Sequence, residues 1–398
     1  MVSTFGWLDT DNEQRRKMLE VVDLFKEEGT VDELGIGSIR DALADALFPG
    51  TSVLQTRLRY VLFIPWLMQQ ASHGNRSSTE MSARFRASEY ELIYALGNGD
   101  EKLGVIGNTA RAKLKRMPSS MYWAAMGTWN IRNSDLSPEA YFRRQYEYRR
   151  LATRTARADD PESRELLPIN DLDPHLPTAP PGLLGKVDFN LGTKEEQYLS
   201  DVIAASTPGS MLAWLIRDQP GNSPDYVWQL DNLREAPEQL QDLIDHARRF
   251  HTAIYGAAVL YNLLLARKSD RDELVAEYEA ALPLWRDELQ ATGVLDDWSR
   301  AGWWATIRDH NPRLRQTTKN FVNSWLGLVE SDSDLAADPT AIKLINMRER
   351  QIKGGRARLA NQAALDRWSG RSGLSRLDYR WSVAHRHLKD LYDARLTA

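Results

Sequence analysis

The sequence predicts an all-α fold, and three observations support that prediction. Helix-start signatures recur along the chain, long amphipathic windows follow them, and strand-like alternation is almost absent. Only residues 225–230 alternate in the manner of a strand, and a single strand forms no sheet. At 398 residues with 42% hydrophobic content, the chain is long enough for two or three domains with their own cores.

Five helix starts can be placed from the sequence. A Ser or Thr followed three residues later by an acidic side chain forms a capping box, and a proline behind a capping side chain marks the first helical position. These starts lie at 10–13, 137–138, 193–196, 269–272 and 338–339. The 13 tryptophans are scattered along the chain, which favours helix-packing anchors over a single ligand cage.

A proline-rich stretch gives the clearest domain boundary. Six of the 17 prolines fall between residues 158 and 192, and this density prevents a helix and favours an extended connector. We therefore predict two helical domains joined by a Pro-rich connector. The N-terminal domain covers residues 1–158, the connector covers 159–192, and the C-terminal domain, with a basic C-terminal region, covers 193–398.

Composition excludes several classes of protein. The 51 basic and 55 acidic residues give a net charge of −4, which excludes a histone-like protein, and the absence of Cys removes disulfides, Cys-ligated zinc and thiol catalysis. Residues 1–8 do not resemble a secretory signal, and the apolar run near 61–68 is far shorter than the roughly 20 residues that span a bilayer. We expect a cytoplasmic protein with no membrane contact and no cofactor.

Metal and catalytic motifs are also missing from the sequence. His246 and His251 are five positions apart and do not share a helix face as a metal pair would, so we predict no metal site. No phosphate-binding loop, zinc-protease motif or nucleophile elbow occurs. Our leading prediction therefore assigns no catalytic residue.

Charge is unevenly distributed along the chain. Residues 111–158 and residues 341–398 each carry a net charge of +8, although the whole chain is acidic. Arg greatly outnumbers Lys, and its planar guanidinium binds phosphate bidentately, although codon usage in a GC-rich genome produces the same excess. Two basic islands in an acidic protein indicate a polyanionic partner or an acidic protein subunit.

A basic face is predicted over residues 342–363, opposite an apolar face at helical spacing. Gly354-Gly355 either lies within this amphipathic helix or breaks it into a short basic hinge. Further arginines follow with Trp368 between them, so phosphate contact and stacking are both available. A solvated face, or docking on an acidic protein, is the alternative interpretation. The predicted nucleic-acid contacts are Lys343, Arg350, Lys353, Arg358, Arg367 and Arg371.

A second anion site is predicted beside the turn at Pro49-Gly50. A capping box formed by Ser52 and Gln55 indicates a helix start, where free N–H groups and the helix dipole favour an anion. The alternative is a capped turn whose arginines pair with acidic residues of the preceding helix, Asp41 and Asp45. The predicted phosphate ligands are Thr51, Ser52, Arg57 and Arg59.

Arg380 and His385 satisfy the R-x4-H spacing of helical HEPN ribonucleases. Those enzymes use the Arg and His of two protomers against an RNA phosphodiester, so this resemblance implies a ribonuclease with Arg380 and His385 as catalytic residues. Trp381 stands where that family has a polar residue. We keep this activity as an alternative to a non-enzymatic function.

Five short segments resemble one uncharacterised bacterial family, catalogued as a domain of unknown function. They are FGWLD at 5–9, DELGIGSIRD at 32–41, LFPGTS at 47–52, QTRLRY at 55–60 and LDYRW at 377–381. Because they come from both ends of the chain, the resemblance is expected to cover its full length. It implies a place beside helicases, phospholipase D-like proteins and methylases in phage-defence or restriction loci, and it assigns no catalytic residue.

These observations lead to one main functional hypothesis. We expect a non-enzymatic, nucleic-acid-associated subunit of a bacterial antiviral defence complex, with DNA favoured over RNA and other defence proteins as partners. Besides the ribonuclease, a structural adaptor that docks on acidic protein partners is the remaining alternative. A net charge near zero also permits a homo-oligomer without requiring one.

Overall fold

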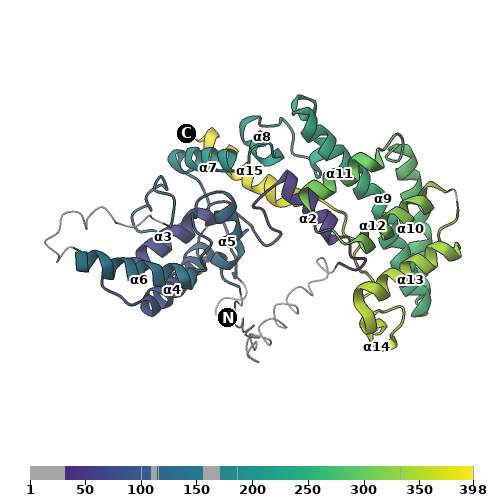
Figure 1. Ribbon diagram of the computed structural model, residues 1–398, viewed down its shortest axis with the longest axis horizontal. Helices are drawn as coiled ribbons and strands as arrows, with labels where there is room; N and C mark the ends of the chain where they lie inside the picture. The colour runs from purple at the N-terminus through teal and green to yellow at the C-terminus, as the bar shows by residue number, and fades with distance from the viewer. Residues whose placement is uncertain are drawn as a thin grey trace, which may run out of the picture. The chain divides into compact units, whose positions relative to one another are not determined.

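Helices dominate the computed structural model, which is 62% helix and is drawn in Figure 1. It describes residues 32–99, 101–108, 114, 116–155, 171–185, 187–331 and 333–397. No strand occurs in these residues, and their only isolated β-bridge joins Arg132 to Leu172. The predicted all-α fold is therefore confirmed.

The described residues form the following helices in chain order. The α-helices are α2 (Gly37–Leu47), α3 (Tyr60–Ser72), α4 (Ser78–Gly97), α5 (Pro118–Thr128), α6 (Pro138–Thr155), α7 (Thr193–Ser206), α8 (Met211–Arg217), α9 (Glu238–Lys268), α10 (Asp272–Ala291), α11 (Arg300–His310), α12 (Gln316–Glu330), α13 (Pro339–Lys353), α14 (Gln362–Leu365) and α15 (Trp381–Leu396). The 3-10 turns are η3 (Val227–Gln229), η4 (Leu233–Glu235) and η5 (Gly354–Arg356).

Two of the predicted helix starts have the expected cap. The Asp338 carboxylate accepts the Thr340 N–H at 2.7 Å, and the Ser137 hydroxyl accepts the Ala140 N–H at 3.2 Å. In both cases a proline follows and occupies the first helical position, where its missing N–H leaves no bond unmade.

Other local predictions need correction. At the start of α7 the cap is Gly192, whose N–H donates to Glu195, so the predicted box is displaced by one residue. Helix α10 begins at Asp272 without a side-chain cap. Within the strand-like stretch 225–230, residues 227–229 form η3, and the Tyr226 N–H donates to the Gln229 side chain. The helix predicted at 10–13 lies outside the described residues.

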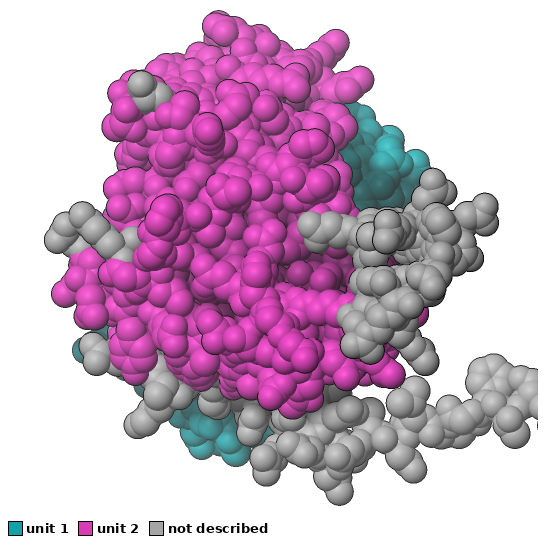
Figure 2. All heavy atoms as spheres, turned by 90° about the vertical axis from the view of Figure 1, so that its left-hand side faces the viewer, with its two compact units in different colours: residues 1–43, 243–377 teal, residues 44–242, 378–398 magenta. Residues whose placement is uncertain are grey.

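The chain divides into two compact units, coloured separately in Figure 2. Unit 1 comprises residues 1–43 and 243–377, and unit 2 comprises residues 44–242 and 378–398. The domain division predicted from the sequence, at 1–158, 159–192 and 193–398, stays a prediction. Residues 159–170 of its connector lie outside the described residues.

Unit 2 is built around α3, most of whose residues are buried. Helix α3 packs against α4 and α5, and α4 packs against α6 (Figure 1). Part of the proline-rich stretch joins this core: the Phe189 ring lies 5.4 Å from the ring of Tyr60, and the Pro177 carbonyl accepts the indole N–H of Trp66 at 2.6 Å. The described part of the stretch therefore contributes to the packing of unit 2.

Unit 1 contains most of α9 and the helices α10 to α14. Two buried tryptophans attach α10 and α12 to α9: Trp285 donates its indole N–H to the Thr252 carbonyl at 2.7 Å, and Trp325 donates to the Ala253 carbonyl at 2.9 Å. Their rings lie 6.0 Å apart. These tryptophans act as helix-packing anchors, as the scattered pattern predicts.

Replacing Gly50 by alanine is expected to destabilise unit 2. Gly50 has φ +83°, and an added Cβ would lie only 2.4 Å from Nε1 of Trp129, which itself donates to the Pro49 carbonyl. Left-handed strain alone contributes about 1–3 kcal/mol, and the clash adds to it. Gly209→Ala is the matched control, because Gly209 has φ +75° with open space around it. Urea unfolding should show a larger loss of unfolding free energy for Gly50→Ala than for Gly209→Ala. Equal losses would contradict the clash with Trp129.

Candidate nucleic-acid interface

The turn that carries Thr51 and Ser52 is closed by its own hydrogen bonds. Thr51 is buried and donates its hydroxyl to the Phe48 carbonyl at 2.6 Å, while the Ser52 N–H donates to Gln55 at 3.1 Å. One contact of the predicted capping box, from the Ser52 N–H to the Gln55 side chain, is therefore present, while the Gln55 N–H donates to the backbone carbonyl of Ser52. The helix predicted to start there is wrong, since α3 begins only at Tyr60.

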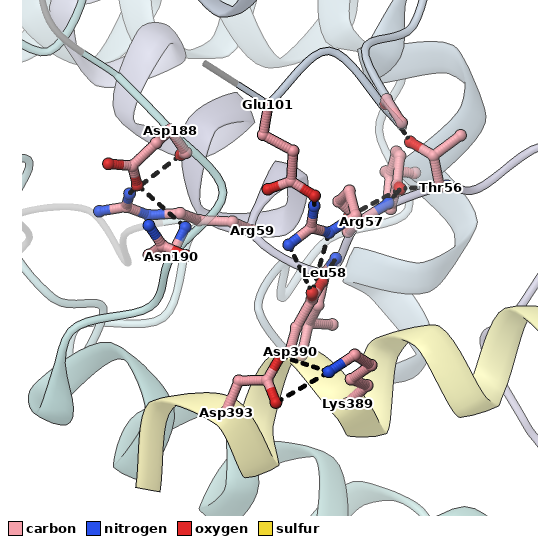
Figure 3. A network of polar contacts seen from close by, with 12 residues as sticks. Thr56, Arg57, Leu58, Arg59, Glu101, Asp188, Asn190, Lys389, Asp390 and Asp393 are labelled. Carbon is pink, nitrogen blue, oxygen red and sulfur yellow. Dashed lines mark hydrogen bonds and ion pairs between the residues drawn. The ribbon is translucent and has the colours of Figure 1, made fainter. Parts of the chain in front are cut away.

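Arg57 binds two carboxylates of unit 2, as Figure 3 shows. Its Nε and Nη2 atoms each lie 2.8 Å from Oδ1 of Asp390, and its Nη1 donates to Glu101. The Leu58 N–H donates to the other oxygen of Asp390 at 2.8 Å. Burial raises the pKa of Asp390 to about 6, although Arg57 and the Leu58 N–H both act to lower it. The Arg57 guanidinium, which was expected to bind phosphate, thus already binds a carboxylate.

Arg59 is held in a similar way (Figure 3). Its Nη1 donates at 3.0 Å to both the carboxylate and the carbonyl of Asp188, and its Nη2 donates to Glu195 at 2.8 Å. Both arginines are therefore ion-paired, as the alternative interpretation expects, but the carboxylates named here come from distant parts of the chain. The phosphate site stays a prediction, and a phosphate on Arg57 would have to displace Asp390.

The basic C-terminal region divides into two kinds of cation. Helix α13 ends at Lys353, and Gly354 follows with φ +55°, so the two glycines break the amphipathic helix. Lys353 binds Glu33, Glu349 and the hydroxyl of Tyr261. Arg358, beyond the break, lies 2.9 Å from the other oxygen of Glu33. These two predicted contacts are thus part of a polar network inside unit 1.

The other predicted cations of this region are exposed. Lys343 and Arg350 lie seven residues apart on α13, on the face that also exposes Met347. This spacing places their Cα atoms about 10 Å apart along the helix. Arg367 is exposed as well, and Arg371 is 74% exposed with Glu277 only at 4.0 Å. Within the described residues, no ion pair is found for Lys343, Arg350 or Arg367.

Arg380 and His385 bind different partners in unit 2. Arg380, which precedes α15 with φ +66°, pairs with Asp45 and donates to the Thr51 carbonyl at 3.0 Å. The Nε2 atom of His385 lies 3.0 Å from the hydroxyl of Ser223. The ribonuclease alternative, which needs both side chains at one phosphodiester, stays a prediction.

Sequence reasoning missed the acidic partners Glu33, Glu349 and Asp390. One signal was available for Glu349, because it precedes Lys353 by four residues on the same helix, the spacing of an ion pair. Nothing in the sequence links Glu33 to Lys353 or Asp390 to Arg57, since these pairs form only when distant segments come together.

Two other classes of feature are absent from the described residues. In the ranges that the structure describes, no group of three or more His, Asp and Glu side chains is arranged to hold a metal ion. Among the helices of the same ranges, none has the length and apolar character needed to cross a membrane.

Comparison with known proteins gives one result. Residues 2–395 match a family described as a family of unknown function, DUF6361. The chain belongs to DUF6361. This match covers both the N-terminal and the C-terminal segments on which the sequence resemblance rested. No curated protein and no solved structure matches this DUF6361 chain.

Proposed function

We propose that this DUF6361 protein binds nucleic acid through the exposed cations of unit 1 as a subunit of a bacterial antiviral defence complex. The observation that carries the binding proposal is the division of the basic C-terminal region into paired and exposed cations. Residues 341–377 hold nine basic and two acidic residues. Arg348, Lys353, Arg358 and Arg376 bind acceptors of unit 1.

The cations that remain are suited to phosphate contacts. Lys343, Arg350, Arg356 and Arg367 are exposed, and no ion pair is found for them among the described residues. A protein that neutralises phosphates with such side chains gains affinity from the release of counterions, and that affinity falls steeply with salt. DNA is the expected ligand. The defence role and the partner proteins rest on the genomic neighbourhood that the sequence resemblance implies.

The test is a salt titration of binding to fluorescent duplex DNA and single-stranded RNA, followed by anisotropy. We expect log affinity to fall linearly with log salt, and Lys343→Ala/Arg350→Ala to reduce the slope by about 1 for each phosphate that the variant no longer neutralises. Both side chains are exposed, so unfolding free energies should change by no more than about 0.5 kcal/mol.

Arg84→Ala/Arg86→Ala is the matched control. It removes the same charge from exposed positions of α4 in unit 2 and should leave the slope unchanged. Equal reductions in the two double variants would show that net charge, and not the α13 face, determines binding. No binding at low salt would overturn the proposal and favour an acidic protein partner.

A further inference from the structure

A serine hydroxyl and a histidine imidazole meet on the surface of unit 2. The hydroxyl of Ser223, in the irregular segment after α8, lies 3.0 Å from Nε2 of His385 on α15. Ser223 is exposed and His385 is half-buried. A hydroxyl within hydrogen-bond distance of an imidazole nitrogen is the arrangement in which serine acts as a nucleophile and histidine removes its proton.

The surrounding residues hold both members of this pair in position. The His385 ring stacks on Trp381 at 4.9 Å and 12°, and the buried indole of Trp381 donates to the carbonyl of Pro224, the residue after Ser223. The segment is also closed on itself: Asn222 accepts the Asp231 N–H, and its amide donates to the Gln229 carbonyl. These contacts support the hydroxyl and the imidazole from both sides of the pair.

His385 is suited to act as a base. Burial lowers its pKa below the ordinary value, and the positive charge of Lys389 on the same helix lowers it further. The imidazole is therefore neutral near pH 7, the form that accepts a proton. Arg380 is not needed for this role, because its guanidinium binds Asp45 and the Thr51 carbonyl.

We propose that Ser223 is a nucleophile activated by His385 and that it reacts with ester-like acyl or phosphonyl electrophiles. With an ester, a bond forms between Oγ of Ser223 and the carbonyl carbon while His385 takes the hydroxyl proton. The bond to the leaving alcohol breaks, and that alcohol receives the proton from the imidazolium. Water then attacks the acyl-serine while His385 takes a proton from that water. The acid is released, and the imidazolium returns the proton to Oγ of Ser223.

A fluorophosphonate probe tests the proposal directly, because the bond between Oγ and phosphorus forms as the phosphorus–fluorine bond breaks and fluoride leaves. The full chain is treated with the probe and the modified residue is identified by peptide mass spectrometry. We expect the adduct on Ser223, its loss in Ser223→Ala, and labelling slower by about tenfold or more in His385→Gln.

Ser382→Ala is the matched control, since Ser382 is also exposed and lies on α15 near His385. Its labelling at Ser223 should equal that of the unchanged protein. The proposal is overturned if Ser223 carries no adduct at excess probe, or if labelling is unaffected by His385→Gln. Circular dichroism of each variant confirms that it is folded, so that loss of labelling reports chemistry at the pair.

Discussion

Glu349→Ala is expected to destabilise unit 1 by about 3–5 kcal/mol, the range found when one partner of a buried ion pair is removed. The Glu349 carboxylate is fully buried, at 0% exposure. One of its oxygens accepts the Tyr261 hydroxyl at 2.6 Å and the Arg358 N–H at 2.8 Å, and lies 3.2 Å from Nζ of Lys353. The other oxygen accepts the Leu359 N–H at 2.9 Å.

Alanine would leave the Tyr261 hydroxyl and the N–H groups of Arg358 and Leu359 without this acceptor, while Lys353 would keep Glu33. Burial acts to raise the pKa of Glu349, but the hydrogen bonds from Tyr261, Leu359 and Arg358 outweigh it and hold this pKa below its ordinary value. The charged form is therefore the form that the network stabilises. Losing it should destabilise α9, α13 and the segment after η5, because each supplies donors to this carboxylate.

Urea unfolding followed by circular dichroism measures this effect. Glu349→Gln keeps one acceptor oxygen but lacks the charge, so its loss of unfolding free energy should be smaller than that of Glu349→Ala. Arg350→Ala is the adjacent control on α13, where an exposed side chain should change stability by no more than about 0.5 kcal/mol. If Glu349→Ala were as stable as Arg350→Ala, the network would not contribute to the stability of unit 1.

The fold class was predictable because its signals are local. The caps at Ser137 and Asp338 depend on residues within four positions of one another, and the break at Gly354 depends on the glycine itself. Residues 225–230 alternate in the manner of a strand, but a strand needs a neighbour to accept its N–H groups. Within the described residues the segment instead closes on Gln229.

The basic surface was less predictable because its cations look alike in the sequence. Lys353 and Arg350 are three residues apart on one helix, yet Lys353 binds Glu33, more than 300 positions away, and Arg350 stays exposed. Residues three apart lie on the same helix face, so the difference depends on which of the two cations Glu33 reaches. Helical periodicity gives the basic face but not the acidic residue that pairs with part of it.

The cluster around Arg57 shows the same limitation. Its spacing to Ser52 suggested an anion site at a helix start, but the anion found there is Asp390 from the last helix of the chain. A sequence shows that an arginine can bind an anion; it does not show whether the protein supplies one. Long-range pairing therefore determines which predicted cations remain available to a ligand.

Acid sensitivity of unit 2 is expected to depend on His387. This side chain on α15 is 2% exposed, and neither ring nitrogen finds a hydrogen-bond partner among the described residues. Its ring lies 6.4 Å from Tyr122 and 6.1 Å from Trp129. Burial first, and then the positive charges of Arg386 and Arg57, lower the pKa of His387 to about 3.

The direction of the pH effect follows from this pKa. Above about pH 6.5 the imidazole is neutral in both folded and unfolded chains, so it has no pH-dependent effect. As the pH falls toward 3, only the unfolded chain takes up the proton, and stability is lost. Two buried carboxyls act in the opposite direction, because burial raises the pKa of Asp390 to about 6 and that of Glu89 to about 7. Their folded forms bind protons first, so they favour folding as the pH falls.

His387→Leu isolates the histidine, because both buried carboxyls remain in the variant. Between about pH 7.5 and pH 5 the unchanged protein should lose about 2 kcal/mol more stability than the variant. At neutral pH the variant should be about as stable as the unchanged protein, or more stable. The reason is that a buried polar group without a partner is replaced by an apolar one. Trp129 beside the ring makes tryptophan fluorescence a suitable probe of urea unfolding.

His310→Leu is the matched control, because His310 is exposed on α11 and the same substitution should leave the pH dependence unchanged. If His387→Leu and the unchanged protein lost equal stability on acidification, His387 would have to be protonated in the folded chain. The ring would then need an acceptor that the buried surroundings of Tyr122 and Trp129 do not provide. Equal acid sensitivity would thus contradict the packing of α15 in unit 2 as well as the lowered pKa.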